Sequence, residues 1–407
     1  MNRKVFLNST DKACFPNRLD LNKIRKFLEE NNWQFVDDYC EADLILTGTC
    51  AYEKSFEDDS INRIIKIQDT KKPDAKFIVW GCLPKINKER LQEVFHGDFV
   101  GPDEFEKLND LISAETNIQD IDDANELTEE DISTYAAYPK LFNFIKPLFN
   151  GIEKHLRLKL QPFYNYSACI FGSDTFYLRV SSGCLNRCSY CAIKNARGDL
   201  KSKPLNTVVD EFKLGLKQGY KEFALVGQEV GSYGVDIKTD LVELLNLMVK
   251  EDGDYKLHLL FIEPSWFVKL FPKLKEVLKS GKITSINLTV QSGSDRILRN
   301  MNRFYKIDDV MGCIRELKEQ SPGVIVRTHL MVGFPDETEE DFQKTVGILN
   351  KFDLVNGLFE FSPRAGTPAA KLDNQIPADI KKKRYNKLYW KGVRKAFRSF
   401  KIESSSD

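Results

Sequence analysis

The sequence predicts an α/β protein in which an N-terminal doubly wound parallel-sheet domain is followed by a partial (β/α)6 barrel. Short apolar runs alternate with helical patterns over residues 1–115, and the alternation returns at about residue 173. An acidic stretch lies between the two series. The length of 407 residues, with 42% hydrophobic and 29% charged residues, suits a globular chain of two or three domains.

The first series predicts a sheet with helices on both of its faces. Its four strand-like runs are KVFLNS, ADLILTGTC, AKFIVWGC and GDFVG, and a helical pattern follows each of them. Ligand sites in parallel sheets lie at the carboxyl ends of the strands. Cys14 lies in the loop after the first run, and Cys50 and Cys82 end the second and third runs, so we expect these three cysteines to meet at one sheet edge.

The second series predicts the barrel domain, over residues 173–402. Its six strand-like runs are TFYLRVS, EFALVG, KLHLLFI, SINLTVQ, VIVRTHLMVG and LFEFSP. Cys184 follows the first run, where a barrel places its catalytic loops. Residues 116–172 are predicted to form an acidic linker and an amphipathic helical insertion, and residues 403–407 a disordered tail.

Composition excludes several classes of protein. No run of 18 apolar residues is present, so we expect no membrane span. The start, MNRKVFLNSTDKACF, lacks the apolar core and cleavage site of a secretory signal, which predicts a cytoplasmic protein. In that compartment the nine cysteines favour metal binding or redox chemistry over structural disulfides.

Charge is distributed unevenly along the chain. Residues 381–401 hold ten Lys and Arg and no acid, and only Glu403 and Asp407 follow as acids. Residues 1–380 therefore contain 50 of the 60 basic residues and 58 of the 60 acidic residues. This part of the chain has a net charge of −8. The basic stretch either binds an anion or forms a solvated amphipathic helix, because its apolar residues recur at helical spacing.

The segment SSGCLNRCSYCAI places Cys184, Cys188 and Cys191 in a C-x3-C-x2-C pattern. A structural zinc site needs four ligands, and none of the four histidines is local. A redox site of the thioredoxin type would need only one CxxC. Cysteine thiolates also hold iron–sulfur clusters, and three of them leave one iron free to bind a cofactor or substrate. We therefore favour an iron–sulfur site.

The motif GCLNRCSYCAI after a strand resembles the cluster loop of radical S-adenosylmethionine enzymes, in particular the methylthiotransferases. The resemblance implies that Cys184, Cys188 and Cys191 hold a [4Fe–4S] cluster that binds S-adenosylmethionine. The pattern C-x2-N-x2-D at Cys14, Asn17 and Asp20, with the later TC and GC pairs, is similar to the N-terminal domain of that family. Cys14, Cys50 and Cys82 would then hold a second [4Fe–4S] cluster.

Further motifs resemble family signatures: ARGDLKSKP, VGQEVGSYG, VQSGSDRILRNMNR, HLMVGFPDETEEDF and FSPRAGTPAA. The resemblance implies contacts with the cofactor for Tyr190, Gln228, Glu229, Gln291, Ser292, Arg327 and Gly333. It implies contacts with substrate for Arg197, Arg364, Lys381, Lys382, Lys383 and Arg384. No side chain is expected to act as an acid or base, because the cofactor generates the radical.

The chain departs from the family pattern at several places. We expect it to lack the small β-barrel domain of usual members. Lys194 stands where a proline is usual, and Lys203 stands where an arginine is usual. The resemblance implies methylthio transfer, with a tRNA adenosine near the anticodon as the expected substrate. A protein, peptide or metabolite is the alternative, and sulfur insertion without the methyl group is another. Flavodoxin or ferredoxin is the expected electron donor, and a cluster-bearing sensor is the non-enzyme alternative.

Overall fold

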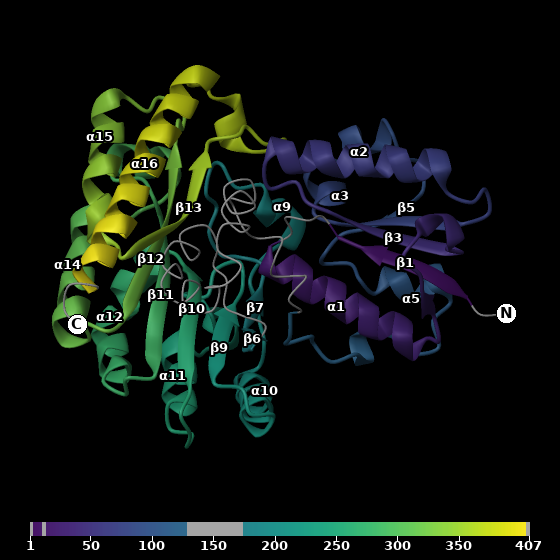
Figure 1. The fold of residues 1–407 in the computed structure, drawn as a ribbon, viewed down its shortest axis with the longest axis horizontal. Helices are drawn as coiled ribbons and strands as arrows, with labels where there is room; N and C mark the ends of the chain where they lie inside the picture. Colours follow the sequence, from purple (N-terminus) through teal and green to yellow (C-terminus); the bar gives the residue numbers. More distant parts are fainter. Residues whose placement is uncertain (1–2, 10–13, 128–173, 404–407) are drawn as a thin grey trace.

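A computed structural model describes residues 3–9, 14–127 and 174–403 (Figure 1). The chain forms two α/β domains that lie side by side, with helix α9 (Ile193–Arg197) at the junction (Figure 1). Each domain is built on a parallel sheet. The predicted fold class is therefore confirmed.

The N-terminal sheet has the strand order β2-β1-β3-β4-β5, with every neighbouring pair parallel. Its strands are β1 (Lys4–Asn8), β2 (Gln34–Phe35), β3 (Leu44–Thr49), β4 (Lys76–Gly81) and β5 (Asp98–Val100). The order reverses between β1 and β3, the point at which such sheets bind ligands. The two-residue edge strand β2 was not predicted, because it is too short to show periodicity.

Helices cover both faces of this sheet. They are α1 (Phe15–Glu30), α2 (Lys54–Thr70), α3 (Leu83–Ile86), α4 (Lys88–Gln92) and α5 (Lys107–Ile112). Alternate residues of each strand enter different cores: Ile45 packs with α2, whereas Leu46 packs with α1 and α5. This alternation follows from the two-residue period of a strand and produces the doubly wound arrangement.

The second sheet has the strand order β13-β12-β11-β10-β9-β6, again with every pair parallel. Its strands are β6 (Thr175–Arg179), β9 (Glu222–Val226), β10 (Lys256–Ile262), β11 (Ile283–Gln291), β12 (Ile325–Val332) and β13 (Leu354–Glu360). These six strands correspond to the six predicted runs. A short antiparallel pair, β7 (Ser181–Ser182) and β8 (Lys201–Ser202), brackets the cysteine loop.

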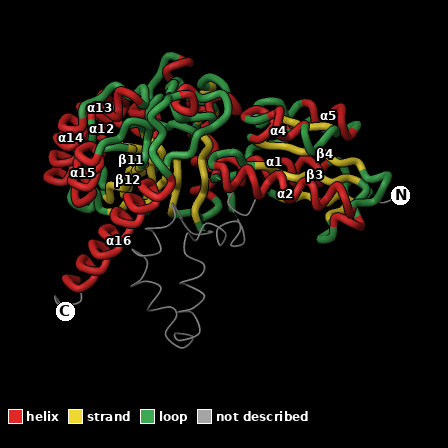
Figure 2. The backbone as a smooth tube through the Cα atoms, turned by 90° about the horizontal axis from the view of Figure 1, so that it is seen from above, coloured by secondary structure: helices red, strands yellow, loops and turns green. Residues whose placement is uncertain are grey.

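Helices lie along the outside of this curled sheet (Figures 1 and 2). They are α10 (Leu205–Lys217), α11 (Leu241–Met248), α12 (Pro264–Leu278), α13 (Asp295–Asn300), α14 (Ile307–Gln320), α15 (Glu339–Ile348) and α16 (Ala378–Glu403). Short 3-10 turns are Tyr39–Glu41, Ile118–Asp120, Val235–Ile237, Leu349–Lys351 and Pro368–Lys371. Apolar faces of these helices and strands form one continuous core.

Some sequence expectations fall partly outside the described residues. The predicted linker and helical insertion at 116–172 is described only to residue 127, and residues 404–407 of the predicted tail are not described. In the part of the chain that is described, no helix has the length and apolar character needed to cross a membrane.

A glycine in β3 provides a test of the N-terminal core. A Cβ on Gly48 would lie 2.6 Å from Cζ2 of Trp80, a fully buried ring, and 3.1 Å from the Cα of Ser9. We expect Gly48→Ala to lower the free energy of unfolding by about 1–3 kcal/mol through overpacking. Urea denaturation measures the change.

Gly312, in helix α14, is the matched control, because a Cβ there meets nothing within 4 Å. Gly312→Ala should stabilise the protein by roughly 0.5–1 kcal/mol through helix propensity. Equal stability of the two variants would contradict the packing described for β3 and β4.

Candidate functional site

The three N-terminal motif cysteines gather at the carboxyl edge of the first sheet. Cys14 precedes α1, Cys50 follows β3 and Cys82 follows β4. Their thiols lie within electrostatic range of one another. Burial raises the pKa of Cys82 to about 11, and burial together with the other two sulfurs raises the pKa of Cys50 well above its ordinary value. These thiols need a nearby cation before they can ionise at neutral pH.

The barrel cysteines form a second set in the loop between β7 and α9. Cys184, Cys188 and Cys191 lie within electrostatic range of one another, and burial is the main cause that raises the pKa of Cys184 to about 12 and of Cys191 to about 11. Gly183 has φ of +70°, and a Cβ there would meet the Asp199 carbonyl oxygen at 2.0 Å. Glycine is therefore required at the entrance to the loop.

Backbone and side-chain contacts fix this loop to the barrel. The amide of Ser189 donates to the Met301 carbonyl at 2.9 Å, and the amide of Gly183 donates to Gln228 Oε1 at 2.8 Å. The ammonium group of Lys194 donates to the Cys184 carbonyl. Lys194, which replaces the usual proline, thus ties helix α9 back to the first cysteine.

A cavity lies where the two domains meet, and Cys191 of the barrel set is part of its lining. Tyr52 and Glu53, which follow Cys50, form the wall from the N-terminal domain, and Tyr190 and Cys191 form part of the opposite wall. The rest of the lining comes from the barrel: Ala192, Ile193, Met331, Phe359, Glu360, Phe361, Ser362 and Arg364. The Tyr52 ring packs edge to face on Phe359, with centroids 5.5 Å apart, so both domains shape this cavity.

Five of the seven residues expected to contact the cofactor lie at or just after the carboxyl ends of barrel strands, whereas Tyr190 lies in the cysteine loop and Arg327 lies within β12. Glu229 accepts backbone N–H bonds from Gly231 at 2.6 Å and Ser232 at 2.7 Å, and burial raises the pKa of this carboxyl to about 7. Gln291 is 6% exposed, has φ of +69°, and its Oε1 has no hydrogen-bond partner among the described residues. Such a strained, buried and unpartnered amide is suited to receive a donor from a ligand.

The remaining residues of that group are also largely buried. Arg327 is 4% exposed within β12, and Ser292 Oγ lies 3.3 Å from Thr345 Oγ1. Gly333 has φ of +73°, and a Cβ there would collide with the stem of Lys381. Gly333 therefore permits α16 to pack against the end of β12.

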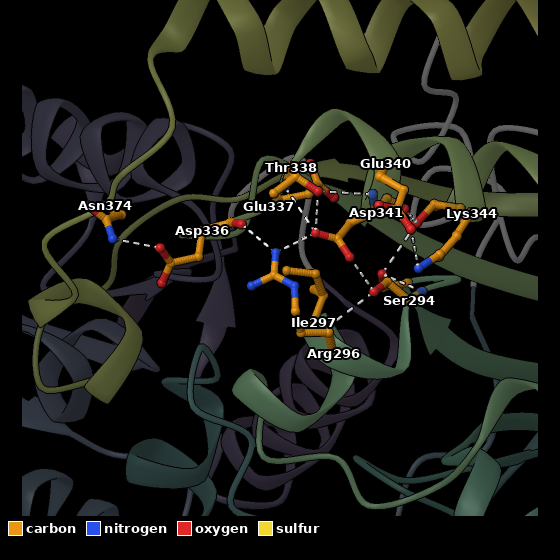
Figure 3. Close-up of polar contacts among 12 residues, drawn as sticks. Ser294, Arg296, Ile297, Asp336, Glu337, Thr338, Glu340, Asp341, Lys344 and Asn374 are labelled. Atoms are coloured by element: carbon orange, nitrogen blue, oxygen red, sulfur yellow. Dashed lines mark hydrogen bonds and ion pairs between the residues drawn. The ribbon is translucent and has the colours of Figure 1, made fainter.

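Asp341 organises the loops that follow β11 and β12 (Figure 3). It forms a capping box with Thr338 at the start of α15, accepts a bond from Ser294 Oγ at 2.6 Å, and pairs with Arg296. Burial alone would raise the pKa of Asp341, but these hydrogen bonds outweigh it and lower the pKa. One carboxylate thus holds the loops that carry Gln291 and Gly333.

The six residues expected to contact substrate are not brought together. Arg197 is buried and contacts the N-terminal domain, whereas Arg364 lines the cavity and pairs with the buried Glu57. On α16, Lys381 Nζ donates to the Phe361 carbonyl at 2.9 Å, Lys382 lies 3.4 Å from Glu360, and Arg384 pairs with Glu337 at 2.7 Å. Lys383 is exposed on α16.

Arg303, the last residue of the motif VQSGSDRILRNMNR, is a residue of the site that the sequence did not predict. Its guanidinium is 4% exposed, and Nη1 lies 3.4 Å from both Cys188 Sγ and Tyr190 Oη. The cavity residues Tyr52, Glu53 and Phe359 were missed as well. The position of Tyr52 two residues after Cys50 was the one available signal for them.

The chemistry of the two cysteine sets fits iron–sulfur clusters. Among the described residues, no group of three or more His, Cys, Asp and Glu side chains is arranged to hold a single metal ion. In a [4Fe–4S] cluster each thiolate binds a different iron, so its ligands need not converge on one point. Three mutually close thiols without a histidine, found twice, are the donor sets that such clusters use.

Comparison with protein families divides the chain in the same way as its fold. Residues 178–349 match the radical SAM superfamily, where SAM is S-adenosylmethionine. Residues 8–101 match a family described as uncharacterized protein family UPF0004. Each match lies within one of the two domains, and together they include all six motif cysteines.

Individual relatives extend over most of the chain. It is 31% identical to ribosomal protein uS12 methylthiotransferase RimO of Carboxydothermus hydrogenoformans, over 92% of this chain and 80% of the relative. It is 29% identical to threonylcarbamoyladenosine tRNA methylthiotransferase MtaB of Thermotoga maritima, over 92% of this chain and 79% of the relative. The structure of the radical methyltransferase TsrM from Kitasatospora setae shares the fold, with a TM-score of 0.59 and 17% identity over 91% of this chain and 77% of that one.

The loop anchor at Asp341 can be tested by removing its charge. We expect Asp341→Asn to lower the free energy of unfolding by about 2 kcal/mol at neutral pH, because charge-assisted hydrogen bonds are lost. A lowered pKa stabilises the fold above the ordinary carboxyl range, and this stability is lost as pH falls through the lowered folded-state value. The difference between variant and wild type should therefore shrink on acidification, as followed by urea denaturation.

Glu340→Gln is the control, since Glu340 is 80% exposed and pairs only with Lys344 in α15 among the described contacts. This substitution should change the free energy of unfolding by less than about 0.5 kcal/mol. A loss for Asp341→Asn that does not depend on pH would contradict the proposed anchor.

Proposed function

Because the chain belongs to the radical S-adenosylmethionine methylthiotransferase family, we propose that it replaces a C–H bond of its substrate by C–SCH3, with a [4Fe–4S] cluster at each set of cysteines. When bound, the barrel cluster and S-adenosylmethionine supply the carbon-centred radical that abstracts hydrogen, chemistry that belongs to the cofactor. Cys184, Cys188 and Cys191 would hold the first cluster. Cys14, Cys50 and Cys82 would hold the second.

The shared cavity is the observation that supports this proposal most directly. Tyr52 lies within electrostatic range of Cys14 and Cys50 on one side and of Cys191 on the other. The cavity therefore lies beside Cys191 of the barrel set and, at Tyr52, near Cys14 and Cys50 of the N-terminal set. Hydrogen abstraction and sulfur transfer to the same carbon require this proximity.

The cavity wall suits reactive chemistry. Met331 and Phe359 form apolar surface beside Tyr52 and Tyr190, which limits the access of water to a reactive centre. Arg364 borders the same space, and its Nε has no hydrogen-bond partner among the described residues. We assign Arg364 the role of positioning a carbonyl or carboxylate oxygen of the substrate.

For the substrate, we favour a polypeptide segment. The uS12 methylthiotransferases among the relatives act, by name, on a ribosomal protein. Among the described cavity residues, Arg364 is the one cation and is paired with Glu57, whereas the carboxylates are Glu53 and Glu360, of which Glu360 lies 3.4 Å from Lys382. A phosphate group would meet these carboxylates, whereas a cationic protein segment would be attracted.

A tRNA substrate is the second candidate, and helix α16 favours it. The ten cations of residues 381–401 follow a body with a net charge of −8. Arg384 and Lys381 are engaged within the fold, but Lys383 and Arg394 are exposed. Exposed cations on one helix can neutralise phosphates outside the cavity.

Iron loading tests the two-cluster proposal. Anaerobic reconstitution should give about eight irons per chain, and a C184A/C188A/C191A variant should keep about four. A Cys40→Ala variant should match wild type, because Cys40 is exposed and lies outside both sets. Retention of all the iron in the triple variant, or zinc in place of iron, would contradict the proposal.

Mass spectrometry separates the two substrate classes. Reconstituted enzyme, reductant and S-adenosylmethionine are incubated with a uS12-type ribosomal protein or with total tRNA. We expect the protein to gain a methylthio group in place of hydrogen. If tRNA gains it instead, log affinity should fall with log salt by about 0.9 per phosphate contacted, and a K383Q/R394Q variant should flatten that slope.

Lys371→Gln, which changes an exposed lysine outside α16, serves as the matched control for salt dependence. Modification of tRNA alone would overturn the polypeptide assignment while leaving methylthio transfer intact. A gain of sulfur without its methyl group would instead overturn the reaction type.

A further inference from the structure

We propose that Arg197 is a positioning residue, which fixes the N-terminal cysteine set relative to the barrel set and supplies the N-terminal set with a permanent positive charge. The inference rests on the proposed function, because it assigns Arg197 a role toward the second cluster. It replaces the expectation that Arg197 contacts substrate. Arg197 is not among the described residues that line the cavity.

Helix α9 links the two cysteine sets directly. It starts two residues after Cys191 and ends at Arg197. Ala192 and Ala196 pack into the core of the N-terminal domain against Leu83, which follows Cys82. A displacement of the barrel loop therefore moves Arg197, and a displacement of Arg197 moves the N-terminal site.

The guanidinium of Arg197 contacts the polar residues that hold the N-terminal cysteines. Its Nη2 donates to Asn17 Oδ1 at 2.5 Å and to Asp20 Oδ2 at 2.6 Å. Asn17 in turn lies 3.8 Å from Cys82 Sγ, and its amide lies 3.5 Å from the carbonyl of Thr49, the neighbour of Cys50. Asn17 and Asp20 are both on the first turns of α1, directly after Cys14. Arg197 thus reaches all three cysteine positions through two side chains.

The positive charge of Arg197 lies close to the N-terminal thiols. Asp20 has no solvent exposure and pairs with Arg197 at 2.6 Å and with Arg179 at 2.7 Å. Arg179 also lies within electrostatic range of Asp123, so two carboxylates balance these two guanidinium groups. Arg197 itself lies within electrostatic range of the thiols of Cys14 and Cys82, so its charge would act on thiolates that hold a cluster.

The test isolates the N-terminal site. In the C184A/C188A/C191A background only the N-terminal set can hold a cluster, so its iron content and midpoint potential are measured without interference. Arg197→Gln removes a positive charge and should make the potential more negative, whereas Asp20→Asn removes a negative charge and should make it more positive. Arg197→Lys, which keeps the charge, should return the potential towards that of the unaltered site.

The full-length chain provides a second measurement. Lysine cannot bind Asn17 and Asp20 with the planar geometry of arginine. Arg197→Lys should therefore still form 5′-deoxyadenosine but yield about tenfold less methylthiolated product per 5′-deoxyadenosine, because the two sites are misplaced. Arg315→Gln, at an exposed arginine of α14, is the control and should match wild type in both measurements.

Opposite shifts of potential distinguish a charge effect from general damage, which would move both variants in the same direction. Equal potentials for Arg197→Gln and Arg315→Gln, or shifts of the same sign for Arg197→Gln and Asp20→Asn, would overturn the inference. If Arg197→Gln does not fold, as judged by circular dichroism, the potential of Asp20→Asn and the product yield of Arg197→Lys test the inference in its place. Wild-type protein that loads no N-terminal cluster would overturn the proposed function as well, whereas full loading with unshifted variants overturns this inference alone.

Discussion

The architecture depends on one constraint: each parallel sheet delivers its loops to a single edge, and these two edges face each other across one cavity. The loops after β1, β3 and β4 carry three cysteines, and the loop after β7 carries the other three. The contact between Tyr52 and Phe359 marks the junction. Neither domain alone provides a complete cavity, so the orientation of one sheet relative to the other decides whether the site exists.

Buried charges specify that orientation. Glu57 of the N-terminal domain pairs with Arg364 of the barrel, and Asp20 pairs with Arg197 and Arg179. Buried ion pairs of this kind contribute little net stability, but a misaligned interface would leave each charge unpaired. The same groups therefore discriminate against incorrect docking of the domains, and one of them, Arg364, also lines the cavity.

The fold was largely predictable because its signals are local. Long strands such as β11 and β12 are visible in the sequence as apolar runs. The two-residue strands β2, β7 and β8 are too short to produce a recognisable pattern. The cysteines were predictable because their spacing reflects the chemistry of their ligands. The partners of the buried arginines were not predictable from the sequence. Asn17 and Arg197 are 180 residues apart, and no residue near Arg364 in the sequence indicates that it pairs with Glu57. Charge is visible in a sequence, but whether it faces solvent or a buried carboxylate depends on tertiary contacts.

The position of α9 also sets an order for biosynthesis. Ala192 and Ala196 complete the apolar core around Leu83 and Ile86, although they lie about a hundred residues further along the chain. Domains generally fold as units while the N-terminal part leaves the ribosome first. Here the early domain emerges with part of its core still missing, and it closes only after the first barrel strand has been translated. The apolar surface that Ala192 and Ala196 cover therefore stays uncovered until residue 196 has been translated.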